Sequence, residues 1–192
     1  GSEMCIRDSA PAHAQDADAA KTVSYTLTVP EAGSRHIDIA ITFETSETTP
    51  KLQLPAWKPG AYRIQNWQAQ VSEVSAVARN GGDLRVEETG KREWTLHGEH
   101  GGQVTFKYRY KHLPTNRSKT WCCVEGPEVF MYVVGGKTRP TRNTFVLPDG
   151  WKVACGMDLT DDERVFTSID YDTMADCPVE MGELYIDSFE VD

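Results

Sequence analysis

The sequence of 192 residues lacks the features that define several large classes of protein. No apolar run approaches the roughly 20 residues that a membrane-spanning helix needs. Basic residues are few, since 20 Lys and Arg stand against 29 Asp and Glu and give a formal net charge of −9. Binding to nucleic acid or to an anionic membrane surface needs a basic face. We therefore expect neither partner, and 39% hydrophobic and 26% charged residues predict an ordinary globular protein.

The five histidines form no catalytic or metal-binding motif. His97 and His100 are three residues apart, but they lie in a glycine-rich stretch with no third ligand nearby. The sequence contains no His-Glu-x-x-His, no Gly-x-Ser-x-Gly and no Cys-x-x-Cys. The acidic run 161–163 lacks the alternate-position spacing of a calcium loop. On spacing alone the chain carries no complete active site, and we expect no metal or cofactor in it.

Cysteine is sparse beyond Cys5, which lies in a segment that we exclude from the fold. The four others are Cys122, Cys123, Cys155 and Cys177. An oxidising compartment would allow one or two disulfides among them, and four cysteines permit three full pairings. The other interpretation is that they are ordinary small buried residues.

Residues 1–21 are predicted to be a disordered tail. Gly1–Ser2 is typical of the scar left by tag removal, and Met4–Ser9 resembles a translated sequencing adaptor. Ala12–Ala14 is a small-x-small triplet of the kind that signal peptidase cuts after. We therefore expect an exported, periplasmic bacterial protein in which residues 22–192 form a single β domain. A chance alanine-rich linker is the alternative.

Most of the chain alternates apolar and polar residues with a period of two, which predicts half-buried strands. The segments that alternate or read as strands are Val23–Val29, Ile37–Phe43, Val71–Ala78, Leu84–Glu87, Trp94–Leu96, Val104–Tyr110, Phe130–Val134 and Phe145–Leu147. Asn80–Gly81 predicts a tight hairpin turn with positive φ angles. One short helix is expected at Tyr171–Ala175, with Asp170 as its N-cap. The fold class is therefore all-β, a sandwich of two mostly antiparallel sheets.

Two longer motifs resemble a known family. Leu54–Tyr62 reads Leu-Pro-Ala-Trp-Lys-Pro-Gly-Ala-Tyr, and Asp170–Gly182 reads Asp-Tyr-Asp-Thr-Met-Ala-Asp-Cys-Pro-Val-Glu-Met-Gly. Both resemble the N-terminal domain of the glycyl aminopeptidase family of zinc metallopeptidases, family 61 of the metallopeptidases. There the patterns are Leu-Pro-x-Trp-x-Pro-Gly-Ser-Tyr and Asp-Tyr-Asp-x-Leu-x-Asp-Ser-Pro-Val-Glu-x-Gly. This chain departs from them at Ala61, Met174 and Cys177.

The resemblance implies a β domain that precedes a thermolysin-like catalytic domain. In the family that second domain binds zinc through His-Glu-x-x-His and a later Glu, which have no counterpart here. We therefore expect a non-catalytic part of an exported aminopeptidase, with the catalytic domain as its partner and a peptide as the parent enzyme's substrate. Two alternatives from other classes are a stand-alone carbohydrate- or ligand-binding module and a structural interaction domain.

The resemblance also suggests roles for particular side chains. In the similar gluzincin aminopeptidases an acidic side chain of the β domain helps to hold the substrate's α-ammonium group, and the candidates here are Glu125 and Glu128. The competing interpretation is that both are ordinary solvated carboxylates. Glu180 is expected to bond to backbone at the seam between domains.

The large aromatic residues have two candidate roles. Trp57, Tyr62, Trp67 and Trp121 are either core anchors or part of the surface that packs on the missing domain, and we expect at least half of them in the core. An exposed seam would also promote self-association of the isolated domain.

Overall fold

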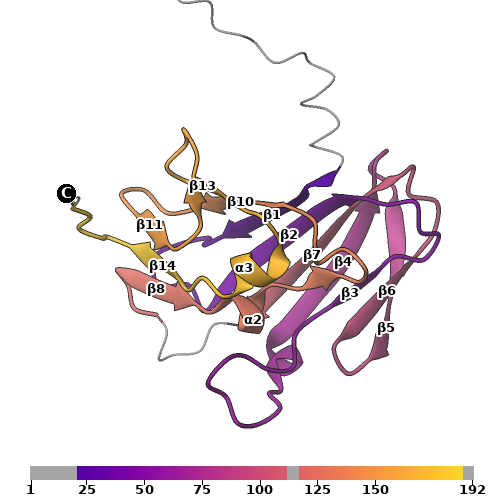
Figure 1. Ribbon diagram of the computed structural model, residues 1–192, viewed down its shortest axis with the longest axis horizontal. Coiled ribbons are helices and arrows are strands. Elements are labelled where there is room, and N and C mark those ends of the chain that lie inside the picture. Colours follow the sequence, from indigo (N-terminus) through magenta and orange to yellow (C-terminus); the bar gives the residue numbers. More distant parts are fainter. Residues whose placement is uncertain (1–20, 112–116, 188–192) are drawn as a thin grey trace, which may run out of the picture.

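The computed structural model describes residues 21–111 and 117–187, and this part of the chain is nearly all β (Figure 1). Its strands are β1 (Val23–Thr28), β2 (His36–Glu44), β3 (Lys51–Gln53), β4 (Val71–Ala78), β5 (Asp83–Gly90), β6 (Glu93–His97), β7 (Gln103–Lys111), β8 (Trp121–Val124), β9 (Tyr132–Val133), β10 (Thr141–Val146), β11 (Lys152–Cys155), β12 (Asp158–Leu159), β13 (Val165–Ser168) and β14 (Val179–Gly182). Its helices are η1 (Trp67–Gln70), α2 (Gly126–Val129) and α3 (Tyr171–Ala175). The predicted all-β class is confirmed. The predictions for the tail at 1–20 and for its Ala12–Ala14 triplet lie outside the described residues.

The strands form a large mixed sheet and a small antiparallel one. The large sheet has the order β12-β13-β10-β1-β2-β7-β4-β5-β6-β3-β9, and the small sheet has the order β11-β14-β8. β1 lies antiparallel to β2 on one side and parallel to β10 on the other. In Figure 1 the small sheet lies at one end of the molecule and β5 and β6 lie at the other.

The core lies on the inner face of β1, β2 and β7. The alternation that predicted these strands is confirmed, because the apolar positions of each are buried and the intervening positions are partly or fully exposed. The buried side chains of these three strands are Val23, Tyr25, Leu27, Ile37, Ile39, Ile41, Phe43, Val104, Phe106, Tyr108 and Tyr110. α2 and α3 lie in front of this face in Figure 1.

The segment that follows α2 corrects one prediction. The run Phe130–Val134 was expected to be a strand, but only Tyr132–Val133 forms one, as β9. The three preceding carbonyl groups accept instead from buried tyrosine hydroxyls: Val129 from Tyr108 at 2.6 Å, Phe130 from Tyr171 at 2.7 Å, and Met131 from Tyr25 at 3.0 Å. A buried carbonyl needs a partner. Side chains supply it here, so the segment stays buried outside any ladder.

The turn at Asn80–Gly81 also differs in detail from the prediction. Gly81 has a φ of +83°, but Asn80 is not among the residues with positive φ. The Gly81 amide donates to the carbonyl of Ala78 at 2.9 Å, and the Ala78 amide donates to that of Gly82 at 2.8 Å. This is a type I turn followed by a left-handed glycine, the pattern of a longer hairpin loop.

α3 confirms the predicted helix. The Asp170 carboxylate accepts from the Thr173 amide at 2.8 Å, and this hydrogen bond lowers the pKa of Asp170. The helix packs closely on α2, since a Cβ at Gly126 would lie 2.3 Å from the Ala175 carbonyl oxygen. Only glycine fits that contact, and it brings the second family motif against α2.

Candidate functional site

The first family motif forms an exposed loop between β3 and η1. Pro59–Gly60 makes a type II turn, with a φ of +80° at Gly60 and a hydrogen bond of 3.1 Å from the Ala61 amide to the Lys58 carbonyl. Trp57 is 51% exposed and Tyr62 is fully exposed. The indole of Trp57 donates to the carbonyl of Ala61, so the ring is held across the turn.

Lys58 fastens this loop to α2. Its Nζ lies 2.7 Å from Glu128 Oε1 and also forms an ion pair with Glu125. The Glu128 side chain is only 10% exposed, whereas that of Glu125 is 42% exposed. Both carboxylates singled out from the sequence therefore meet one ammonium group, and neither is an isolated solvated glutamate. We call these three residues the lysine clamp.

The clamp has a distinctive electrostatic balance. Burial alone would lower the pKa of Lys58, but its hydrogen bonds to Glu125 and Glu128 outweigh burial and raise it above its usual value. Two carboxylates against one ammonium leave a net charge of −1. The buried Tyr110 lies near enough that the charge of Glu128 adds to the effect of burial in raising its pKa. Its hydroxyl has no hydrogen-bond partner among the described residues.

The two family motifs meet at α2. A hollow of about 120 Å³ is lined by Lys58 and Pro59 from the first motif, by the start of α2, and by Ala175, Asp176 and Pro178 from the second. Residues more than a hundred positions apart thus form one surface. The sequence contains both motifs but does not indicate that they touch.

Glu180 bonds to a side chain within this chain, and its expected backbone bond at the seam between domains stays a prediction. It lies on β14 and accepts from the Trp121 indole at 3.1 Å, across the neighbouring strand β8. It stands opposite Cys123 in register. Burial is the main cause of the raised pKa of that thiol, and the charges of Glu180 and Glu125 add to it.

The expectation that at least half of the four large aromatic residues are core anchors is wrong. Trp67 is buried, at the start of η1, but Trp57 and Tyr62 are exposed and Trp121 is only partly covered. The local sequence gives no signal that separates them, because burial depends on which side of the loop faces the sheet. Three of these rings are therefore available at the surface.

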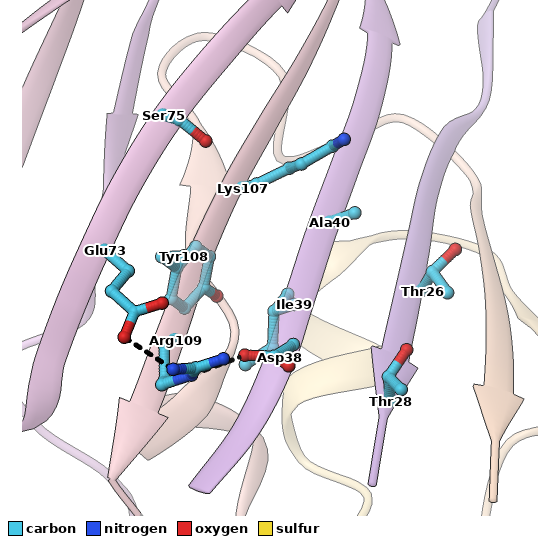
Figure 2. Close-up of a pocket in the computed structure, with 10 residues that line it drawn as sticks. All are labelled: Thr26, Thr28, Asp38, Ile39, Ala40, Glu73, Ser75, Lys107, Tyr108 and Arg109. Atoms are coloured by element: carbon cyan, nitrogen blue, oxygen red, sulfur yellow. Dashed lines mark hydrogen bonds and ion pairs between the residues drawn. The ribbon is translucent and has the colours of Figure 1, made fainter. Parts of the chain in front are cut away.

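A second charged cluster lies on the outer face of the large sheet (Figure 2). Arg109 on β7 binds Asp38 of β2 at 2.9 Å and also pairs with Glu73 of β4. These residues and Lys107 line an open hollow of about 250 Å³ whose floor includes Ala40. Neither sequence motif includes any of them. We call Arg109, Asp38 and Glu73 the arginine cluster.

Within the described ranges, no three His, Cys, Asp or Glu side chains come together in a way that could hold a metal ion. His97 lies beside Glu87, and His100 contacts the carbonyl of Glu47, so the two do not converge. No helix of that same part of the chain is long and apolar enough to cross a membrane.

The fold and the clamped loop define an all-β domain whose two signature motifs share one surface. The chain belongs to the Peptidase M61 N-terminal domain family, whose model matches residues 24–183. The family resemblance seen in the sequence is therefore confirmed. No curated protein matches the chain.

The chain is similar to several solved structures. An aminopeptidase N family protein from Idiomarina loihiensis is similar with a TM-score of 0.81 and 23% identity, over 88% of this chain and 30% of that one. An M1 zinc metallopeptidase from Deinococcus radiodurans gives a TM-score of 0.47 and 16% identity over 84% of this chain and 41% of that one. Leukotriene A4 hydrolase from Saccharomyces cerevisiae gives a TM-score of 0.48 and 10% identity over 85% of this chain and 29% of that one. The chain spans less than half the length of each.

Proposed function

We propose that this chain is the non-catalytic N-terminal domain of an exported zinc aminopeptidase and that it packs against the catalytic domain through the surface where the two motifs meet. The observation that carries the proposal is the joining of both motifs at α2 beside an exposed aromatic loop. The aminopeptidase N family relative, of which this chain matches 30%, supports it. The Ala12–Ala14 triplet is the reason to propose export.

The signature loop has the character of a docking surface. It projects Trp57, Tyr62 and the 69% exposed Ile64 into solvent, and large aromatic rings bury about 150–250 Å² each when they are covered. The clamp holds the base of the loop, so little conformational freedom remains to be lost on docking. Exposed apolar side chains that are held in place in this way favour a protein partner. For the same reason we expect the isolated chain to self-associate at high concentration.

The net negative charge of the clamp supports a second, finer role. A carboxylate beside the catalytic cleft would attract the α-ammonium group of a peptide and fix its free N-terminus. Glu125 is the candidate for this contact because it is the more exposed of the two glutamates. Glu128 then keeps Lys58 in place. Zinc, bound by the catalytic domain, would supply the Lewis acid and the activated water.

The docking proposal is tested by reading the gene downstream of the codon for Asp192 and producing its continuation as a separate chain. An open frame with His-Glu-x-x-His and a later Glu is expected, and the two chains should bind in calorimetry. Trp57→Ala and Tyr62→Ala should each weaken binding at least tenfold. Leu159→Ala, which alters an equally exposed residue on β12, is the control and should leave it unchanged. A stop codon at that point, or equal affinity for all variants, refutes the proposal.

The ammonium proposal is tested in the complete enzyme by comparing Glu125→Gln with Glu99→Gln, a change on an exposed turn. Glu125→Gln should raise KM at least tenfold for peptides with a free N-terminus. Acetylation of the peptide should weaken binding to the wild-type enzyme much more than to the variant. Equal sensitivity to acetylation in both enzymes contradicts this role.

The alternative of a carbohydrate-binding module rests on the same exposed rings, because aromatic faces stack on sugars. Glycan binding by the isolated chain that disappears in Trp57→Ala would favour it over the docking proposal.

A further inference from the structure

Two cysteine residues that are distant in sequence come together in the small sheet. Cys155 is the last residue of β11, and Cys177 lies just before β14, in the connection from α3. β11 and β14 are antiparallel neighbours, with Cys155 opposite Val179. Figure 1 shows β11 beside β14, with the connection from α3 entering at the same end. The fold therefore brings the two residues to one end of one strand pair.

Both thiols lie against the same short stretch of backbone. The Cys177 sulfur interacts with the amide of Gly156, and the Cys155 sulfur interacts with the amide of Met157. A Cβ built on Gly156 would lie 3.3 Å from the Cys177 Sγ, so that sulfur touches the residue directly after Cys155. The charge of Cys177 also acts on the Cys155 thiol, so the two sulfurs are near neighbours.

Two further cysteines of the described chain lie on another strand of the small sheet. Cys122 and Cys123 are neighbours on β8, so their side chains point to opposite faces of the strand. β8 and β11 flank β14 on opposite sides. Two strand spacings amount to about 9.5 Å, beyond the roughly 7 Å between Cα atoms that a disulfide spans. Cys155 is thus within reach of Cys177 but not of either cysteine on β8.

We propose that Cys155 and Cys177 are a disulfide-forming pair that joins the end of β11 to the connection between α3 and β14. The oxidant is a small disulfide such as oxidised glutathione. The thiolate of one cysteine attacks it to give a mixed disulfide and one released thiol, and the second cysteine then displaces the other. Two protein thiols lose two electrons and two protons, and the small disulfide gains them as two thiols.

The surroundings determine the rate of this exchange. Burial raises the pKa of both thiols, and the charges of Asp176 and Asp158 raise that of Cys177 further. Little thiolate is present at neutral pH, so the bond forms slowly there and faster as the pH rises. In Cys177 the thiol donates to the Thr173 carbonyl at 3.3 Å in the reduced state. Oxidation replaces this hydrogen bond with a covalent link.

The test is to incubate the full chain with oxidised glutathione at pH 8.5, alkylate the remaining thiols, and map the peptides by mass spectrometry without reduction. We expect a cross-linked peptide pair that contains Cys155 and Cys177, and alkylated thiols at Cys122 and Cys123. Because the bond closes the loop between the two residues, Tm should rise by about 6–12 °C relative to the reduced protein.

Two variants keep the result interpretable. Cys177→Ser introduces the residue of the family pattern, so it should fold, yet it should lose both the cross-link and the Tm difference between oxidised and reduced samples. Cys122→Ser should keep both. Free Cys155 and Cys177 after oxidation of the folded protein, or a link from either to β8, overturns the proposal.

Discussion

The lysine clamp and the arginine cluster have the same composition in two different settings. Each places one cation between two carboxylates, and each joins segments that are distant in sequence. The clamp lies against α2 with Glu128 nearly buried, whereas the arginine cluster lies on the open face of the sheet (Figure 2). Removing one partner of a buried pair is costly, and exposed pairs contribute little. Burial, not the number of contacts, therefore separates a structural clamp from a surface arrangement.

One strand connects the two regions. Neighbouring residues of β7 point to opposite faces, so Arg109 lies outside in the arginine cluster while Tyr110 lies inside near Glu128. Substitution of Arg109 therefore alters only the outer face of β7, and substitution of Tyr110 alters only its inner face. Four substitutions test this comparison.

Lys58→Met should have the largest effect. Methionine keeps the apolar stem but leaves Glu128 as a poorly hydrated charge without its partner, so the free energy of unfolding at pH 7 should fall by about 2 kcal/mol. Urea denaturation measures it. Because the pKa of Lys58 is raised in the folded state, the contribution is complete below its ordinary value of 10.5 and is lost as the pH rises further. A variant as stable as the wild type at pH 7 would contradict the clamp.

Tyr110→Phe should stabilise the protein by about 0.5–1 kcal/mol, because it removes a buried hydroxyl that has no partner in the described part of the chain. The raised pKa of Tyr110 also means that only the unfolded state loses this proton just above pH 10, so wild-type stability falls there. The variant should show a shallower fall in urea denaturation between pH 9.5 and 11. The matched control, Tyr25→Phe, removes a bond to Met131 and should destabilise by about 1–2 kcal/mol. If Tyr110→Phe and Tyr25→Phe change the free energy of unfolding equally, the hydroxyl of Tyr110 does not differ from that of Tyr25 in its contribution to stability.

Glu73→Gly should stabilise the protein only slightly relative to the wild type, because it also loses the ion pair with Arg109. Glu73 has a φ of +51° at a bulge between Ser72 and Ser75, a conformation that glycine adopts without cost. Glu73→Ala loses the same ion pair but keeps the unfavourable backbone. Thermal unfolding should show that the free energy of unfolding of Glu73→Gly exceeds that of Glu73→Ala by about 1 kcal/mol. If alanine is as stable as glycine, the bulge is not strained.

Arg109→Met should have the smallest effect. Both of its ion pairs lie on an exposed face, where water and salt already screen the charges. Its Tm should stay within about 1 °C of the wild type, with or without 1 M salt. A loss as large as that in Lys58→Met would show that burial does not distinguish the two clusters.

Much of the large sheet could be predicted from the alternation of residues, because β1, β2 and β7 each bury one face. The segment after α2 could not, since its apolar run also suits a strand and only the folded chain brings Tyr25, Tyr108 and Tyr171 to its carbonyls. The candidate site was predicted in part: both glutamates were identified, but their partner Lys58 was not. The sequence marks Lys58 only as a basic residue between Trp57 and Pro59, at a position that the family pattern leaves open.

The parallel pairing of β1 with β10 has a consequence for how the chain folds. β1 lies inside the large sheet, with β2 on one side and β10 on the other. During synthesis the hairpin of β1 and β2 can form early. The other edge of β1 stays unpaired until β10, which ends at Val146, has left the ribosome. Such distant contacts make folding slow and expose an unpaired strand edge in the meantime. Chain fragments that end before β10 should therefore aggregate, and the domain should become resistant to proteolysis only when its C-terminal half is present.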